Sequence, residues 1–313
     1  MVKLRIATRK SPLAMWQAEH IAASLSARFP EADVSFVGRM TKGDKILDQA
    51  LSKVGGKDLF VKEIEAAILE GDAELAVHSL KDMPTELPKE LVIAAFPPRE
   101  DPRDALILAD GLPPADDPVD RLPKGARVGT SSLRRAAQLL HRRPDLEIVS
   151  VRGNVQTRIS KVQELGLAGV VLAYAGLLRL GLADRVSGVL DPATCLPAIG
   201  QGILAVETRA ADPELLRVVG ALDDRDARDA ATAERAFLAK LRGGCQVPIA
   251  GHATFEGPTV HLVGLVASLD GKTVIRRERS GPRELGAELG RALAEEVLGA
   301  GADRILDELL GKS

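Results

Sequence analysis

The sequence has few aromatic residues and no long uncharged apolar run. Phe, Trp and Tyr make up 3% of its 313 residues, which disfavours the aromatic stacking surfaces that bind single-stranded nucleic acid. Its net charge of -2 argues against a generally basic, nucleic-acid-binding surface. No stretch reaches the roughly 18 uncharged apolar residues that a membrane-spanning helix needs. We therefore expect neither a nucleic-acid partner nor a membrane partner.

Secretion signals and metal-ligand patterns are also missing. The first residues, MVKLRIATRKSPLAMWQ, have no apolar core and no small-residue cleavage site, so we expect a cytoplasmic protein. In that compartment Cys195 and Cys245 are expected to be thiols rather than a disulfide. The 5 His and 2 Cys are scattered without metal-ligand spacing, so we expect no metal.

Cys245 follows two glycines in LRGGCQVPIA, at the end of a predicted helix. A thiol in such a turn is compatible with a catalytic nucleophile, a redox switch, an attachment point or no special role. No His motif near Cys245 indicates an activating base. Its role is therefore left open by the local sequence.

The first half of the chain alternates strand and helix patterns. We predict strands at 2–8, 33–40, 73–78, 126–129, 147–151 and 169–173, and helices at 12–29, 59–70, 132–142 and 154–165. This alternation predicts α/β architecture with parallel sheets and helices on both faces. Ser11 is a candidate N-cap of the first helix, with Pro12 at its first position. The Pro- and Asp-rich stretch 97–125 indicates a crossing between domains.

The last third of the chain has a different pattern. A helix at 225–241 precedes three strand-like runs at 249–255, 259–268 and 273–279, and two helices close the chain. We expect GAELGRALAEEVLGAGA to be helical. This order predicts a small α+β domain with an antiparallel sheet.

Three predicted strand-to-helix turns carry cations. Their sequences are IATRKSPLA, VGTSSLRRA and VRGNVQTRI, and their polar residues are Arg9, Lys10, Ser11, Thr130, Ser131, Ser132, Arg134, Arg135, Arg152, Gly153, Asn154 and Arg158. A helix N-terminus favours anions, and arginine binds carboxylate or phosphate in bidentate geometry. Cations oppose the helix dipole there, at a cost of roughly 0.3–1 kcal/mol each. The repetition therefore favours an anionic ligand.

Two questions about these turns stay open. Each arginine is also compatible with a solvated side chain, or with one paired to a local acid such as Asp145 or Glu147. Nor do the turns favour phosphate over carboxylate, because the sequence has neither a P-loop nor a G-x-G-x-x-G motif.

Asp82 lies in LAVHSLKDMPTELP, beside Lys81 and just after a buried strand. A carboxylate at this place is compatible with general acid–base work or with stabilisation of a developing cation. It is also compatible with an ordinary solvated turn residue. We interpret His78 as a hydrogen-bonded structural residue rather than a base.

As a set, these motifs closely resemble the porphobilinogen deaminase (hydroxymethylbilane synthase) family. The matching segments run in order over nearly the whole chain: RIATRKSPLA, KVGGKDLFVKE, AVHSLKDMP, EDPRDA, VGTSSLRR, RRPDL, RGNVQTR, LPAIGQG and GGCQVP. The resemblance implies an enzyme that joins four porphobilinogen molecules head to tail and releases ammonia. Its product is the linear tetrapyrrole precursor of haem.

The resemblance also implies roles for individual residues. Cys245 matches the cysteine that holds a dipyrromethane cofactor through a thioether, whereas Cys195 matches no such motif and is expected to be a packing thiol. Asp82 matches the catalytic aspartate, which binds pyrrole N–H groups and stabilises a positive azafulvene-like intermediate. Residues matching cofactor and substrate carboxylate ligands are Arg9, Ser11, Lys81, Ser131, Ser132, Arg134, Arg135, Arg152, Gly153, Arg158 and Arg179. Lys53 and Lys57 match a loop over the cleft, and Leu178 departs from the expected lysine.

The implied fold has two α/β domains that resemble periplasmic binding proteins, with a hinge and a cleft, plus a small C-terminal α+β domain. Domain 1 would comprise 1–98 and 198–221, domain 2 would comprise 99–197, and domain 3 would comprise 222–313. We expect a monomer. A non-catalytic anion-binding protein and a cysteine-dependent transferase unrelated to pyrroles are the competing hypotheses.

Overall fold

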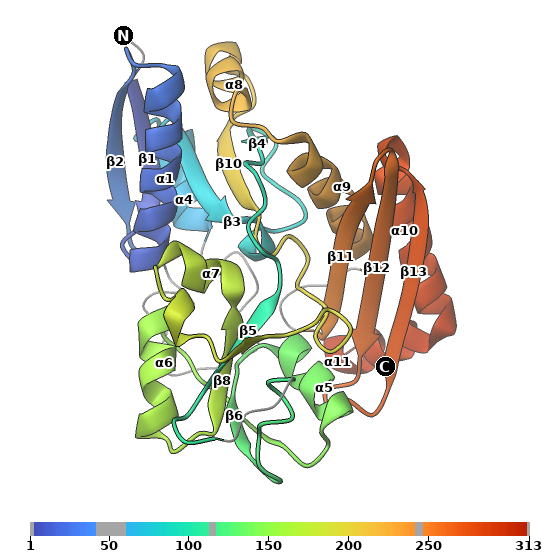
Figure 1. The fold of residues 1–313 in the computed structure, drawn as a ribbon. Coiled ribbons are helices and arrows are strands. Elements are labelled where there is room, and N and C mark those ends of the chain that lie inside the picture. Colours follow the sequence, from blue (N-terminus) through green and yellow to red (C-terminus); the bar gives the residue numbers. More distant parts are fainter. Residues whose placement is uncertain (1–2, 42–60, 113–116, 242–246, 312–313) are drawn as a thin grey trace.

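The computed structural model describes residues 3–41, 61–112, 117–241 and 247–311. Three of the predicted functional residues, Lys53, Lys57 and Cys245, lie outside the described residues. Within the described chain there are two five-stranded sheets and one three-stranded sheet. Figure 1 shows the first sheet above the second, with the C-terminal elements packed beside both.

The first sheet has the strand order β2-β1-β3-β10-β4. Its strands are β1 (Lys3–Arg9), β2 (Asp33–Arg39), β3 (Leu75–Ser79), β4 (Leu91–Ala95) and β10 (Leu204–Arg209). Alternate side chains of a strand point to opposite faces. Leu4 and Ile6 therefore pack with α1 (Pro12–Arg28) and α8 (Pro213–Gly220), whereas Ala7 packs with α4 (Lys62–Leu69).

The second sheet repeats this arrangement, in the order β7-β6-β8-β5-β9. Its strands are β5 (Asp104–Leu108), β6 (Arg127–Gly129), β7 (Glu147–Val149), β8 (Gly169–Ala173) and β9 (Gly188–Val189). Leu106 and Val171 pack on the side of α5 (Leu133–Arg142). Ile107 and Val170 pack on the opposite side, with α6 (Val155–Glu164) and α7 (Tyr174–Arg179).

The prediction of parallel sheets is wrong for two strands. β1 pairs in parallel with β2 and β3, and β6 pairs in parallel with β7 and β8. However, β10 is antiparallel to β3 and β4, and β5 is antiparallel to β8 and β9. Both exceptions follow a crossing from the other sheet, at 96–103 and 190–203. No crossover helix of their own sheet precedes them, so nothing requires them to run parallel.

The C-terminal elements confirm the predicted α+β pattern. They are α9 (Arg225–Lys240), β11 (Ile249–Glu256), β12 (Thr259–Ala267), β13 (Val274–Pro282), α10 (Gly286–Val297) and α11 (Asp303–Leu310). The three strands form an antiparallel sheet. The helix expected over GAELGRALAEEVLGAGA is too long by one turn, because Gly301 takes a φ of 107° and separates α10 from α11. The remaining turns are 3₁₀ at 80–82, 183–185 and 283–285, and π-helical at 298–302.

A buried carboxylate attaches these C-terminal elements to both crossings. Glu234 of α9 is fully buried. It pairs with Arg99 of the first crossing at 2.6 Å and accepts from Gly200 N of the second at 2.6 Å. It also accepts from Ala253 N of β11 at 2.8 Å. Burial alone raises the pKa of a carboxyl, but the charges of Arg99 and His252 outweigh it and lower the pKa of Glu234 to about 2.

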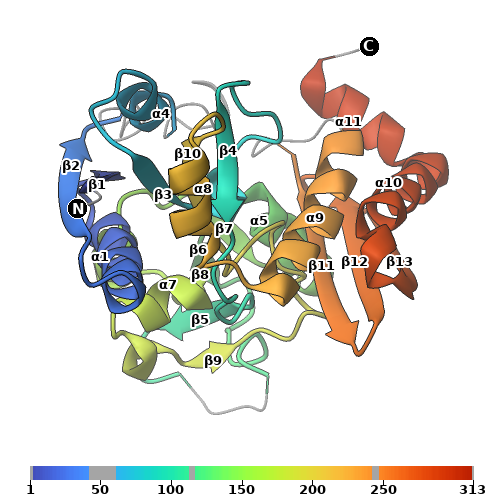
Figure 2. The same ribbon diagram turned by 90° about the horizontal axis from the view of Figure 1, so that it is seen from above.

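Figures 1 and 2 both show α9 between the first sheet and the three-stranded sheet. One apolar core continues across this junction. It runs from Phe237 of α9 to Ile199 and Ile203 of the second crossing, and to Met83 just after the 3₁₀ turn that follows β3. The second crossing is therefore packed between the first sheet and the C-terminal elements. The domain boundaries predicted at 98, 198 and 222 stay a prediction.

The other face of the three-stranded sheet contacts α5. Leu265 and Ala267 pack with Ala137. The carbonyl oxygen of Gly271, in the β12–β13 turn, lies 2.9 Å from His141 Nδ1. Gly271 has a φ of +70°, and a Cβ built there would lie 2.4 Å from the carbonyl oxygen of Ala137. Only glycine fits this close approach of two backbones.

We expect Gly271→Ala to destabilise the protein more than Gly257→Ala. Gly257, in the β11–β12 turn, has a φ of +55° but no described atom within 4 Å of its built Cβ. Both variants carry the cost of a left-handed alanine, about 1 kcal/mol, whereas only Gly271→Ala adds a backbone clash of about 1–3 kcal/mol. Calorimetric unfolding of both variants measures the difference. Equal melting temperatures would show that the turn does not dock on α5.

Candidate active site

A pocket opens where β1 and β3 end. These neighbouring strands are parallel, so their carboxyl ends lie at the same edge of the sheet, where open α/β sheets bind ligands. Its lining residues are Thr8, Arg9, Ser11, Leu13, Ala14, Gln17, Val61, Ile64, Val77, His78, Ser79 and Asp82. The structure therefore brings three predicted site residues together, Arg9, Ser11 and Asp82.

The start of α1 has the predicted geometry. Ser11 has extended backbone angles, and its hydroxyl accepts from Ala14 N at 3.4 Å, with Pro12 following at the first helical position. This confirms Ser11 as the N-cap.

Asp82 and Lys81 lie in the 3₁₀ turn that follows β3. Asp82 is exposed and Lys81 is half-buried, with Lys81 Nζ donating to Gln201 Oε1 at 3.3 Å. Burial, reinforced by the two arginines of α5, lowers the pKa of Lys81 to about 8, although the neighbouring carboxylates oppose the shift. His78 contacts Glu207 Oε2 through Nε2 at 3.0 Å, in keeping with the structural role expected for it.

Hydrogen bonds connect the two turns of the second sheet that precede α5 and α6. Ser132 caps α5 by accepting from Arg135 N at 3.4 Å. Ser131 Oγ donates to Val151 O at 2.5 Å and lies 3.0 Å from Ser150 Oγ. The turn before α5 is thereby fixed against the turn before α6, so the cations of both turns face the same region.

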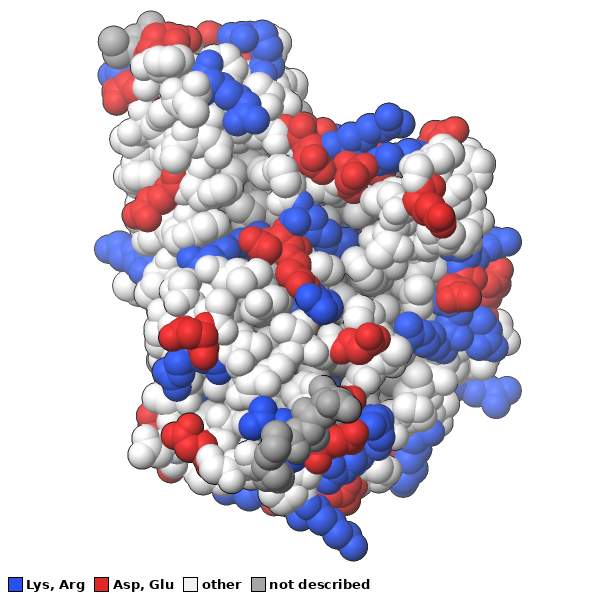
Figure 3. Space-filling view, in the orientation of Figure 1, with Lys and Arg blue, Asp and Glu red and all other residues white. Residues whose placement is uncertain are grey.

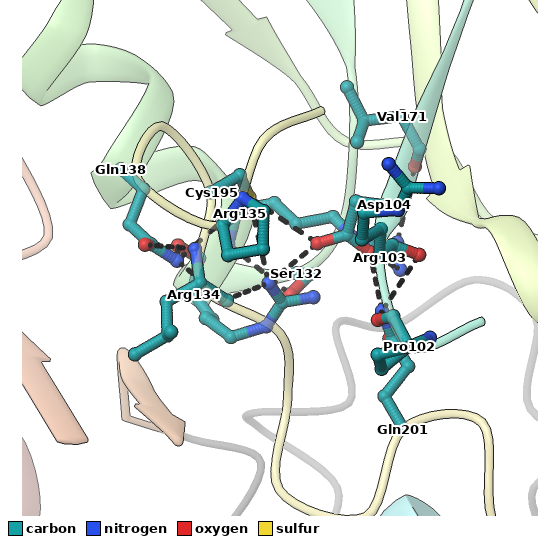
Figure 4. A network of polar contacts seen from close by, with 12 residues as sticks. Pro102, Arg103, Asp104, Ser132, Arg134, Arg135, Gln138, Val171, Cys195 and Gln201 are labelled. Atoms are coloured by element: carbon teal, nitrogen blue, oxygen red, sulfur yellow. Dashed lines mark hydrogen bonds and ion pairs between the residues drawn. The ribbon is translucent and has the colours of Figure 1, made fainter. Parts of the chain in front are cut away.

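Arg134 and Arg135 are buried on the carboxylate of Asp104 (Figure 4). Arg134 Nη1 lies 2.6 Å from Asp104 Oδ2, and Arg135 Nη2 lies 2.8 Å from Asp104 Oδ1. Arg134 Nη1 also donates to Leu196 O at 2.7 Å, and Arg135 Nη1 donates to Val171 O at 3.2 Å. Burial opposes ionisation of Asp104, but these two arginines outweigh it and hold the pKa of the carboxyl well below its usual range.

Asp145 and Glu147, the local acids considered as partners of these arginines, pair with other residues. Asp145 pairs with Arg143 at 2.8 Å, and Glu147 pairs with Arg127 at 3.4 Å. Both acids follow the C-terminal end of α5, whereas the guanidinium groups leave its N-terminal end and point inward toward β5. Cys195 is fully buried beside them, and burial raises the pKa of its thiol to about 12. It is an unreactive packing thiol, as expected.

The turn before α6 supplies two more cations. Arg158 Nε donates to Gly153 O at 2.8 Å. Gly153 has a φ of +116°, and a built Cβ would lie 2.6 Å from Thr157, so the turn requires glycine. Arg152 Nη1 is buried with no hydrogen-bond partner among the described residues. Burial and the charges of Arg135 and Arg152 lower the pKa of Arg158 to about 10, although Asp82 opposes the shift.

Together these residues form a cationic site around one exposed carboxylate. Lys81 interacts electrostatically with Asp82 and both α5 arginines, and Arg158 interacts with Asp82, Arg135 and Arg152. Burial and neighbouring cations lower the pKa values of Lys81 and Arg158, and one N–H of Arg152 has no partner among the described residues. A buried donor without a partner is costly. The arrangement therefore fits a ligand with several anionic groups, and the carboxylates of a dipyrromethane meet this requirement.

Arg179 points to a different place. Its Nη2 donates to Gly202 O of the second crossing at 2.7 Å, and its guanidinium lies 5.8 Å from the ring centre of Trp16. Burial lowers the pKa of Arg179 to about 10. These contacts tie α7 to the crossing and to α1, and its carboxylate-binding role stays a prediction.

Sequence reasoning assigned no role to two residues at the centre of this site, Asp104 and Gln201. Both stand in motifs that carry the family resemblance, EDPRDA and LPAIGQG. Asp104 begins the apolar run DALIL, and a charge at the start of a buried strand needs a partner. The sequence therefore indicated that Asp104 needs a partner, but it could not identify which residue that partner is. Gln201 gave no comparable signal.

Figure 3 shows acidic and basic side chains interspersed over one face of the molecule, within the described residues. The described chain has no helix both long and apolar enough to span a membrane.

Comparisons with known proteins identify the relatives of the chain. A family model, "Porphobilinogen deaminase, dipyromethane cofactor binding domain", matches residues 4–217, and the model of the porphobilinogen deaminase C-terminal domain matches residues 229–299. A porphobilinogen deaminase of Syntrophotalea carbinolica is 53% identical over 306 residues, which is 98% of this chain and 96% of that protein. One of Maridesulfovibrio salexigens is 50% identical over 312 residues and 100% of both chains.

Solved structures show a weaker likeness. An ancestral cationic amino acid solute binding protein is 17% identical with a TM-score of 0.45, covering 70% of this chain and 87% of that chain. A TRAP periplasmic solute binding protein from Desulfovibrio salexigens is 14% identical with a TM-score of 0.42, covering 74% of each chain.

We expect Arg134→Gln and Arg152→Gln to differ in their effect on stability. Arg134→Gln removes one of two cations from the buried Asp104, which costs about 3–5 kcal/mol. Arg152→Gln removes a guanidinium N–H that has no described partner, so the free energy of unfolding should fall by less than about 1 kcal/mol.

Urea unfolding followed by circular dichroism measures both changes. Each variant is compared in a Cys245→Ser background, so that no group attached at Cys245 contributes to stability. Similar losses in the two variants would contradict the assignment of Arg134 to the buried network and Arg152 to the ligand.

Proposed function

Because the chain belongs to the porphobilinogen deaminase family, we propose that it condenses four porphobilinogen molecules head to tail and releases ammonia. The product is hydroxymethylbilane, the linear precursor in tetrapyrrole and haem biosynthesis. One structural observation carries the proposal beyond the family name. The exposed carboxylate of Asp82 lies near Lys81 and Arg158, whose pKa values are lowered, and within the described residues one N–H of the neighbouring Arg152 has no partner. Each porphobilinogen brings two carboxylates, so this charge pattern suits the substrate.

We propose that the chain grows on a dipyrromethane cofactor held by a thioether to Cys245. The match to the cofactor-binding domain supports the cofactor, and the GGCQVP motif supports the attachment residue. When bound, this group supplies the nucleophilic pyrrole carbon to which substrate is added, and carboxylates for the cationic site. A thiolate is a suitable anchor, because it is a soft nucleophile for an electrophilic methylene carbon.

Asp82 is the proposed catalytic residue. When ammonia leaves porphobilinogen, positive charge develops on the pyrrole ring, and the Asp82 carboxylate stabilises it while accepting from the pyrrole N–H. A fixed charge acts strongly on a developing opposite charge because it needs little reorganisation during the reaction. The neighbouring ammonium and guanidinium groups hold the substrate carboxylates, so that the ring lies against Asp82. Their positive charges also offset the negative charge of Asp82.

The remaining assignments follow the family motifs. The proposed carboxylate ligands are Arg9, Ser11, Lys81, Ser131, Ser132, Arg134, Arg135, Arg152, Gly153, Arg158 and Arg179. Arg134 and Arg135 stand in this set on the motif match alone, because their guanidinium groups are already paired with the buried Asp104. Lys53 and Lys57 are proposed to act from a loop over the cleft. We also propose a cytoplasmic location, since the buried Cys195 thiol suits a reducing compartment, and a monomeric state.

Intact-protein mass spectrometry tests the proposed function. The purified protein should carry the extra mass of two linked pyrrole units, and Cys245→Ser should lack it. Cys195→Ala is the matched control and should keep the adduct, since this thiol is buried in the core. An unmodified wild type with full activity would overturn the cofactor assignment. A wild type that binds anions but turns over no porphobilinogen would favour a non-catalytic binding protein.

We expect Asp82→Asn to lose turnover while still carrying the cofactor. The change keeps the side-chain size but removes the charge, so kcat should fall by about 10²–10³ or more. Asp82→Glu keeps the charge and should retain part of the activity, with partly elongated chains left on the enzyme. The measurements are a steady-state assay and mass spectrometry of the bound species. Asp110→Asn, at an exposed aspartate after β5, is the control, and equal activity of the two Asn variants would refute the catalytic role.

A further inference from the structure

Gln201 connects the cationic site with the two crossings. It lies in the second crossing and is 1% exposed. Its Nε2 donates to Pro102 O of the first crossing at 2.6 Å and to Asp104 Oδ1 at 2.9 Å. Its own carbonyl oxygen accepts from Arg99 Nε at 2.9 Å. Both ends of this residue are therefore fixed, and Figure 4 shows its amide directed at Asp104 and Pro102.

These contacts determine which way the amide group faces. Nε2 is surrounded by acceptors, the carbonyl of Pro102 and the ionised Asp104. A flipped amide would bring Oε1 against those same oxygens and lose both hydrogen bonds. Oε1 must therefore face the opposite side, where Lys81 Nζ donates to it at 3.3 Å.

The acceptor of Lys81, Gln201 Oε1, is a neutral amide oxygen. An ammonium group has three donors, and the amide oxygen uses one to fix the position of Nζ without neutralising its charge. A carboxylate at the same place would pair with Lys81 and compete with the carboxylates of a ligand. The amide leaves the positive charge and the other donors of Lys81 available to the ligand.

We propose that Gln201 is a positioning residue, which holds the Lys81 ammonium in place to receive a carboxylate of the substrate or growing chain. The inference rests on the proposed function. It extends that function by assigning the orientation of Lys81 to a residue of the second crossing. Gln201 does not touch the reacting atoms; it acts through Lys81.

The charged groups around Lys81 come from three elements. Asp82 lies in the same turn, Asp104 begins β5, and Arg134 and Arg135 lie in the first turn of α5. The carboxylates favour the ammonium, and the arginines and burial disfavour it. Burial dominates and lowers the pKa of Lys81 to about 8. Removing the amide acceptor takes away a further interaction with the charged form, so the pKa of Lys81 should fall.

The test uses Gln201→Met, with Gln138→Met as the matched control. Gln138 is also buried in this network, where its Nε2 donates to Leu196 O at 3.1 Å and its Oε1 accepts from Leu196 N at 2.7 Å. Its hydrogen bonds within the described chain go to Arg134, Cys195 and Leu196 and not to Lys81. Gln201→Met should raise KM for porphobilinogen about tenfold, with a smaller change in kcat, whereas Gln138→Met should leave KM near the wild-type value.

The pH profile separates positioning from stability. Lys81 must be charged to bind a carboxylate, so kcat/KM should fall as the pH rises through the pKa of Lys81. In Gln201→Met this alkaline fall should begin at lower pH than in the wild type. Gln138→Met should not move it, and Lys81→Arg should remove it. Identical alkaline limbs in wild type and Gln201→Met would overturn the proposal.

A double-mutant comparison shows whether Gln201 acts through Lys81. In a Lys81→Met background, Gln201→Met should cause no further rise in KM. An undiminished tenfold rise in that background would mean that Gln201 acts by holding the crossings, and would refute the proposal. If Gln201→Met does not fold, Gln201→Asn keeps an amide but shortens it by one methylene, and the same comparisons apply.

A direct titration keeps the inference separate from the proposed function. NMR of the holoprotein with ¹³C-labelled lysine, assigned by the signal lost in Lys81→Arg, reports the pKa of Lys81 without turnover. A lower midpoint in Gln201→Met supports the Lys81–Gln201 contact even if porphobilinogen is not the substrate. Failure of the proposed function would instead show as a wild type without the pyrrole adduct and without turnover. An unchanged midpoint in an active, adduct-bearing protein would refute only the role of Gln201.

Discussion

The buried carboxylate of Asp104 is the interaction on which the rest of the site depends. Its two oxygens receive Arg134, Arg135, Gln201 and the thiol of Cys195. Taking a carboxylate out of water costs several kcal/mol, and two buried guanidinium groups compensate for this only in good geometry. Asp104 lies in β5, and its partners lie in α5 and in the second crossing. One charge therefore fixes the relative positions of three segments.

A second buried carboxylate does the same for the crossings. Glu234 holds Arg99 of the first crossing, Gly200 N of the second and Ala253 N of the C-terminal sheet. The C-terminal unit is therefore attached to both crossings. Gln201 lies between the two carboxylates, since Arg99 holds its backbone oxygen and its side chain reaches Asp104. The cationic site is thus built on the crossings.

The balance of charge divides the cations of the site into two groups. Arg134 and Arg135 are already paired with Asp104, which keeps this part of the fold in place. Lys81 and Arg158 have lowered pKa values, and Arg152 has a donor without a partner among the described residues. Under the proposed function, this second group is the one left to bind the carboxylates of a ligand. The distinction depends on burial and on partners rather than on residue type.

The sequence by itself determined the local elements, the cationic helix starts and the family. Ser11 before Pro12 predicted the cap of α1, and the change of pattern near residue 225 predicted the antiparallel C-terminal sheet. These features depend on neighbouring residues and on strand and helix periodicity, which a single sequence displays directly. The motif order likewise identified Asp82 as the candidate catalytic carboxylate.

Tertiary structure alone decided the direction of β5 and β10 and the partners of the buried charges. Arg134 and Asp104 are 30 residues apart, and Gln201 and Asp104 are 97 residues apart. No local periodicity states which distant segment will cover a charge, so Asp145 and Glu147 were the natural but wrong partners. The low dielectric of the interior makes an unpaired charge costly, and packing of the crossings against α5 selects the residue that supplies the pair.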